Sequence, residues 1–169
     1  MLDFARNDAE GGAGNLNGHF KRLAPAALLA LVLAHALPLA ASADTVAQIA
    51  QKWGLIGRWS LDCSLKPDRD NGTVLAYEIA GDNRVVYRRD FGGTTDESEV
   101  VTAEISADGM LNLRVSFPSL KQTRELGLMM QPDGTMRAIY NHNQKNEYSI
   151  KDGNFTANGS PTRPQHKCR

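Results

Sequence analysis

A change of hydrophobic period at Gly54 limits the possible folds of this chain more than any other feature. Before it, Val46, Ile49, Ala50 and Trp53 recur at spacings of three and four, so they share one face of a helix. After it, apolar residues occupy every second position in short runs, which is the pattern of half-buried β-strands. The sequence therefore predicts one short helix over residues 44–53, followed by strands only.

Eight alternating runs follow Gly54, and each defines one face of a strand. In chain order the runs are Trp59, Leu61 and Cys63; Leu75, Tyr77 and Ile79; Val85, Tyr87 and Phe91; Val101, Ala103 and Ile105; Leu111, Leu113, Val115 and Phe117; Leu126, Leu128 and Met130; Met136, Ala138 and Tyr140; and Tyr148 and Ile150.

Turn sequences of hairpin length separate these runs, such as GDN at 81–83, ADG at 107–109 and QPDG at 131–134. A parallel connection needs a crossover of a dozen or more residues, and the sequence offers no helix between the strands to make one. We therefore predict an all-β fold, an antiparallel up-and-down eight-stranded barrel with a short N-terminal helix. A β-sandwich is the alternative, because the same pattern would serve it.

The N-terminal quarter is expected to lie outside this fold. Lys21 and Arg22 precede an apolar run that ends in the small residues Ala41, Ser42 and Ala43, which is typical of a secretory signal peptide. We predict an extension and signal peptide over 1–43 and a single β-barrel domain over 44–169. The mature protein would be periplasmic or secreted from a bacterium, without stable membrane insertion after signal cleavage. An uncleaved anchor is the alternative.

The charge balance and the cysteine content indicate whether the chain binds nucleic acid, a metal or a cofactor. The chain has 19 basic and 19 acidic residues, so no basic field exists to attract nucleic acid, and we expect no nucleic-acid partner. Its two cysteines, Cys63 and Cys168, both lie in the exported part, where an even count favours a disulfide. His166 lies close to Cys168, but the cysteines have no neighbouring cluster of His and Asp residues such as a zinc site needs, so we expect no metal. We expect no cofactor either.

Sequence motifs of catalysis are not found in this chain. It has no nucleophile elbow, no Gly-rich phosphate loop and no HExxH. We therefore do not expect an enzyme, although catalytic residues drawn from distant strands would leave no local motif.

Gly57-Arg58-Trp59 on the first predicted strand resembles the Gly-x-Trp signature of lipocalins and their calycin relatives. The resemblance implies that Trp59 plugs one end of the barrel, that Gly57 provides a tight entry, and that a C-terminal cysteine ties to the barrel wall. The chain lacks the C-terminal helix of lipocalins. It also resembles a group of exported proteins of alphaproteobacteria, through Trp59–Cys63 and the tail from Asp152 to Cys168, but no known function comes with that group.

Polar residues on otherwise apolar faces are the candidates for ligand binding. Extrapolated alternation places Arg89 beside Tyr87, Arg124 beside Leu126 and Leu128, and His142 beside Tyr140, all facing inward. The ligand-binding set is thus Arg89, Arg124, Tyr87, Tyr140 and His142. An apolar pocket with arginines at its base would bind a small apolar or anionic amphiphilic ligand, such as a lipid-like molecule.

The alternative is a barrel filled by its own side chains. Such a protein would act through its surface, as an enzyme inhibitor or as a module that docks on a periplasmic protein.

Overall fold

The structure is a computed structural model that describes residues 43–69 and 72–169. The predicted signal peptide and its extension lie outside the described residues, apart from Ala43. Within the described ranges, no helix has the length and apolar character needed to cross a membrane.

The predicted N-terminal helix is confirmed as α1, Val46–Trp53. The Thr45 hydroxyl accepts from the backbone N–H of Gln48, whose side-chain oxygen accepts from the Thr45 N–H, so the two residues form a capping box. Gly54 ends the helix with φ of 91°, a left-handed conformation that glycine adopts without steric cost. The buried side of α1, Ala47 and Ala50, packs into the core of the sheet.

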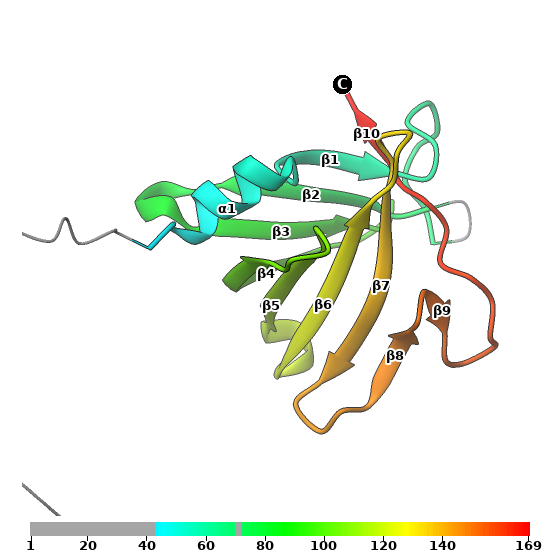
Figure 1. Ribbon diagram of the computed structural model, residues 1–169. Helices are drawn as coiled ribbons and strands as arrows, with labels where there is room; N and C mark the ends of the chain where they lie inside the picture. The colour runs from blue at the N-terminus through cyan, green and yellow to red at the C-terminus, as the bar shows by residue number, and fades with distance from the viewer. Residues whose placement is uncertain (1–42, 70–71) are drawn as a thin grey trace, which may run out of the picture. The chain divides into compact units, whose positions relative to one another are not determined.

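One antiparallel up-and-down sheet contains every strand of the described residues (Figure 1). Its order is β10-β1-β2-β3-β4-β5-β6-β7-β8-β9, so each strand except β10 pairs with its neighbour in sequence. The strands are β1 (Gly57–Ser60), β2 (Val74–Ile79), β3 (Val85–Asp90), β4 (Thr95–Ile105), β5 (Leu111–Phe117), β6 (Gln122–Met130), β7 (Met136–Asn143), β8 (Tyr148–Lys151), β9 (Asn154–Phe155) and β10 (His166–Cys168).

The prediction of an eight-stranded closed barrel is wrong in two respects. Ten strands form in the part of the chain that the structure describes, because the C-terminal tail contributes the short strands β9 and β10. The sheet is also not closed by hydrogen bonds, since β9 and β10 are its two ends and no ladder joins them in the described part of the chain. The sandwich alternative fails as well, because all the strands belong to one sheet.

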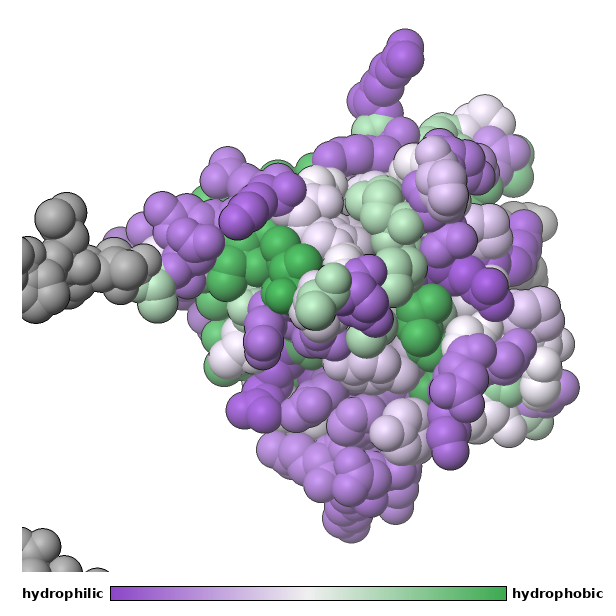
Figure 2. Space-filling model, viewed as in Figure 1, coloured by the Kyte–Doolittle hydropathy of each residue, from purple (hydrophilic) through white to green (hydrophobic). Residues whose placement is uncertain are grey.

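The core lies on the inward face of this curled sheet and under α1. Leu111, Leu113, Val115 and Phe117 of β5 are all buried, as their alternation predicts. Trp59 is buried too, and its indole N–H donates to the carbonyl of Leu55 at 2.7 Å. Outside the core the surface is mainly polar in the view of Figure 2, with apolar residues gathered beside α1.

The pairing of the strands shifts register at three places in the described chain, and two of these β-bulges, in β4 and β7, change which side chains of those strands face inward. In β4, Val100 pairs with Val115 and Thr102 with Arg114, so Val101 is an extra residue. Val101 is consequently 48% exposed and Val100 is buried, which reverses the predicted alternation at the start of that run. In β7, Ala138 pairs with Leu128 and Tyr140 with Gly127, so Ile139 is the extra residue.

The predicted disulfide is confirmed, and it joins Cys63 after β1 to Cys168 in β10. We call residues 156–165, between β9 and β10, the strap; they run along one side of the sheet in Figure 1. Lys167 of β10 also donates to the carbonyl of Gly54 at 2.8 Å, so the end of the chain contacts the end of α1. The disulfide agrees with an oxidising, extracytoplasmic location.

Candidate functional site: an apolar cavity under the strap

The candidate site is a cavity of about 220 Å³ on the inward face of the sheet. It lies between β1–β3 on one side and β6–β9 on the other, where the sheet fails to close. Its lining is mostly apolar and consists of Leu61, Leu75, Tyr77, Tyr87, Leu126, Leu128, Met136, Ala138, Asn141, Ile150, Phe155, Thr162, Arg163 and Gln165.

Two stacked tyrosines form part of the inner wall. The rings of Tyr77 and Tyr87 lie 4.5 Å apart between centroids and are nearly parallel, with 5° between their planes. Burial raises the pKa of Tyr87 to about 12, and it raises the pKa of Tyr77 well above its ordinary value. Both phenols therefore stay neutral at physiological pH, and this wall presents apolar rings with uncharged hydroxyls.

The strap forms the outer wall, and the hydrogen bonds of Thr162 and Gln165 are among those that fix it. Thr162 is buried; its hydroxyl donates to the Ala138 carbonyl at 2.7 Å, and its backbone N–H donates to the Gly153 carbonyl at 2.8 Å. Gln165 and Met136 exchange backbone hydrogen bonds of 2.8 and 2.9 Å, which form an isolated bridge to β7. These bonds hold the strap over the gap in the sheet without closing the ladder.

Phe155 and Arg163 mark the mouth of the cavity, because each lines it and is also exposed to solvent. Phe155 is 41% exposed. Arg163 takes part in none of the ion pairs found over residues 43–69 and 72–169. Its backbone is positioned by the anchored neighbours Thr162 and Gln165, so the mouth carries an unpaired cation on a fixed segment.

Tyr87 is the only member of the predicted ligand-binding set that lines this cavity. Arg89 lies on the same face of β3, but it forms an ion pair with Asp96, whose Oδ1 accepts from the Arg89 Nε at 2.8 Å. Its guanidinium also lies 4.9 Å from the ring centre of Phe117. Asp96 thus neutralises the charge that we expected a ligand to meet.

Arg124 is held by neutral groups. Its guanidinium donates to the side-chain oxygens of Asn141 and Ser149, and no carboxylate within the described residues pairs with it. Burial lowers the pKa of Arg124, and the positive charge of Arg89 lowers it further. Arg124 does not line the cavity itself, but Asn141, which accepts from it, does.

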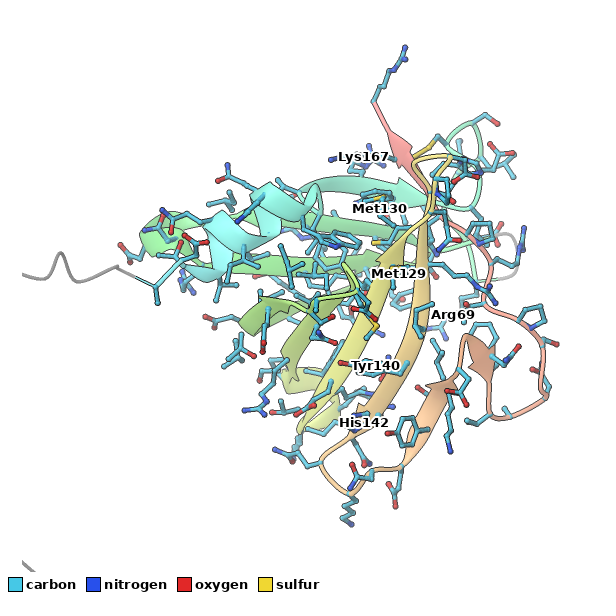
Figure 3. All side chains as sticks on the ribbon, in the orientation of Figure 1. Arg69, Met129, Met130, Tyr140, His142 and Lys167 are labelled. Carbon is cyan, nitrogen blue, oxygen red and sulfur yellow. A yellow bond between two sulfur atoms is a disulfide. The ribbon has the colours of Figure 1, made fainter. Side chains whose placement is uncertain are left out.

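The expectation that Tyr140 and His142 face inward is wrong. The bulge at Ile139 shifts the alternation of β7, so Asn141 pairs with Leu126 on the inward face. Tyr140 and His142 therefore lie on the outer face, where both extend from β7 in Figure 3. Their rings are 5.6 Å apart, and the Nε2 of His142 lies 3.8 Å from a carboxylate oxygen of Glu125.

Sequence reasoning missed Arg163, Thr162 and Gln165 because the tail has no periodic pattern that would assign it a face. The available signal was Cys168, which ties the tail to β1 and so forces the preceding residues to cross the sheet. In the part of the chain that the structure describes, no three His, Cys, Asp or Glu side chains are grouped as ligands of a metal ion.

Comparison with known proteins finds no protein-family model, no curated protein and no solved structure that matches this chain. The chain is thus described by its fold: an antiparallel sheet with one short N-terminal helix. The likeness to lipocalins and to exported alphaproteobacterial proteins remains a prediction from a few residues.

Proposed function

We propose that this protein is a binding module that takes a small apolar or anionic amphiphilic molecule into the cavity under the strap. The observation that carries the proposal is an apolar cavity whose mouth holds an unpaired arginine, Arg163. A ligand of this class places its apolar part against Leu126, Leu128 and Tyr87 and its polar end at the mouth. The disulfide supports a location outside the cytoplasm, and the proposal therefore includes a periplasmic or secreted location in a bacterium.

The size of the cavity limits the ligand. A cavity of about 220 Å³ exceeds the roughly 150 Å³ that accommodates benzene but is below the roughly 300 Å³ at which drug-sized pockets begin. It therefore suits one ring or a short alkyl chain. Burying a five-carbon tail gives about 4 kcal/mol at about 0.8 kcal/mol per carbon, so dissociation constants on the order of 1 mM are expected.

The same cavity argues against the alternative hypothesis, in which side chains fill the interior and the protein acts only through its surface. That alternative requires an interior occupied by side chains, and neighbouring residues leave this space open. Enzymatic activity is not part of the proposal.

A titration with hexanoate and hexan-1-ol, followed by NMR of the Leu126 and Leu128 methyl groups, tests the proposal. Saturable methyl shifts are expected with both ligands. Ala138→Leu adds carbons to a wall residue and is expected to abolish the shifts by filling the space. Ala107→Leu, in the exposed β4–β5 turn, is the matched control and is expected to leave them unchanged.

Absence of saturable shifts, or shifts that persist in Ala138→Leu, would refute binding in the cavity. A separate comparison of hexanoate with hexan-1-ol tests whether the site prefers a negatively charged ligand. Arg163→Gln is expected to weaken hexanoate about five-fold, or about 1 kcal/mol, and to leave hexan-1-ol unchanged. Arg84→Gln, another exposed arginine, is the control. If every variant binds hexanoate and hexan-1-ol with equal affinity, the result would support an apolar ligand and would refute the anionic one.

A further inference from the structure

We infer that the outer face of the sheet carries a second binding site, for the ring of a saccharide, in a hollow beside Tyr140. The hollow has a volume of about 310 Å³ and spans four strands. It is separate from the cavity, because the two share no lining residue and the side chains of Asn112, Glu125 and Tyr140 project from the opposite face of β5, β6 and β7. Its lining consists of Thr102, Ala103, Glu104, Asn112, Leu113, Arg114, Glu125 and Tyr140.

Tyr140 gives the hollow an aromatic wall at a fixed position. Gly127 has no side chain, and a Cβ built on it would lie 2.2 Å from the Tyr140 Cε1, so the ring occupies that space against β6. The Tyr140 hydroxyl donates to the Asn112 Oδ1 at 2.7 Å, which fixes the other end of the side chain. The ring therefore has Gly127 on one side and borders the hollow on another.

An aromatic ring suits the apolar face of a sugar. The face of the ring carries the negative end of its quadrupole, which attracts the weakly positive C–H groups that a pyranose presents on one side. His142 lies 5.6 Å from Tyr140 between ring centres, and Tyr148 lies 4.7 Å from His142, so the aromatic surface continues along the outer face.

Polar groups around the ring match the hydroxyls of such a ligand. Glu104 lines the hollow and belongs to none of the ion pairs among the described residues, so its two oxygens are available to accept from neighbouring hydroxyls. Asn112 uses its oxygen for Tyr140, which leaves its amide N–H groups as donors. The Arg114–Glu125 pair, at 2.9 Å, offers both donors and acceptors.

Two bulges border the hollow and set its composition. The extra residue Val101 turns Thr102 and Glu104 outward on β4, and the extra residue Ile139 turns Tyr140 outward on β7. Without both shifts, Glu104 and Tyr140 would lie on the inward face of the sheet. Donors, acceptors and an aromatic ring around one hollow favour a neutral hydroxylated ring over a simple cation.

An NMR titration with glucose, followed through the backbone amides of Gly127 and Asn112, tests this inference. Saturable shifts are expected with glucose, with a dissociation constant on the order of 1 mM or above, because the hollow is open and shallow. Glycerol has hydroxyls but no ring and is expected to give no saturable shift. Tetramethylammonium chloride tests a cation as the occupant.

Variants assign the binding to the named residues. Tyr140→Ala is expected to raise the dissociation constant for glucose on the order of ten-fold, and Glu104→Ala about five-fold, as for a hydrogen bond to a partly solvated charge. Glu99→Ala, on the same outer face but outside the hollow, is the matched control. Glu104 is exposed, so its variant reports on binding even if Tyr140→Ala destabilises the fold.

Three results would overturn the inference: no saturable shift with glucose, equal shifts with glucose and glycerol, or glucose affinity unchanged in Glu104→Ala. Binding of tetramethylammonium in place of glucose would also overturn it and would assign the hollow to cations.

Discussion

Gly127→Ala should destabilise the protein only while Tyr140 is present. The new Cβ would lie 2.2 Å from the Tyr140 Cε1 and 2.4 Å from its Cδ1, so the ring must move. Such overpacking costs about 1–3 kcal/mol, and loss of the Tyr140–Asn112 hydrogen bond adds about 1 kcal/mol. We expect Gly127→Ala to lower the free energy of unfolding by about 2–4 kcal/mol.

The same substitution should have the opposite sign in a Tyr140→Ala background. The φ of Gly127 lies outside the left-handed region, so alanine fits its backbone without strain. Alanine in the middle of a strand is favoured over glycine by about 0.5–1 kcal/mol, because glycine loses more backbone entropy on folding. The coupling energy between the two positions is then about 3 kcal/mol.

Urea unfolding of the wild type, both single variants and the double variant measures this coupling. Gly134→Ala is unsuitable as a control, because φ at Gly134 is 81° and strain would add to the result; Gly81→Ala, with open space around its Cβ, is the matched control. Equal destabilisation by Gly127→Ala in both backgrounds would refute the packing argument, and so would a neutral effect in the wild type.

Two further predictions concern the cavity wall. The pKa of Tyr87 is about 12 in the folded protein and about 10 in the unfolded chain. The stabilisation that neutral Tyr87 gives to the folded protein should therefore be complete below pH 10 and be lost as the pH rises through 12. The expected loss in the free energy of unfolding is about 2–3 kcal/mol. Unfolding free energies across this range check it, and a Tyr87→Phe variant with an equally steep loss would contradict it. Replacing Cys63 and Cys168 by serine should cost up to about 4–5 kcal/mol, since the disulfide closes a loop of 105 residues. The same variant should bind hexanoate more weakly through release of the strap, and unchanged affinity in the methyl titration would contradict this.

The sequence predicts the regular parts of this fold well, because local patterns encode them. The spacing of Val46, Ile49 and Ala50 identifies α1, and the turn sequences place the hairpins. The strict alternation of β5 identifies its buried residues correctly. The disulfide follows from the number of cysteines and the expected compartment.

The errors arise where alternation is interrupted or absent. A bulge adds one residue to a strand, so every side chain after it lies on the face opposite to the one that simple alternation predicts. The residue types at Val101 and Ile139 give no signal that predicts a bulge there. For this reason the prediction placed Tyr140 and His142 inward. Alternation predicts the correct face for Arg89, but the pairing of Arg89 with Asp96 depends on the register between β3 and β4.

Closure of the sheet also depends on more than local pattern. Eight alternating runs are compatible with a barrel, and whether the last strand reaches the first is decided by curvature and by the tail. Here the tail takes the place beside β1 and covers the gap with the strap, so the cavity wall includes residues that have no strand pattern. Arg163 could not be assigned to the site before the path of the tail was known.

The position of β10 has a consequence for the order in which the molecule is completed. The chain is synthesised from its N-terminus, and one edge of β1 stays without its native partner until His166–Cys168 emerge, after all of β2–β9. The outer wall of the cavity, Thr162–Gln165, arrives at the same late moment. A chain that ends at Pro161 contains the residues of β1–β9 but lacks that wall, the disulfide and the strand that pairs with the outer edge of β1.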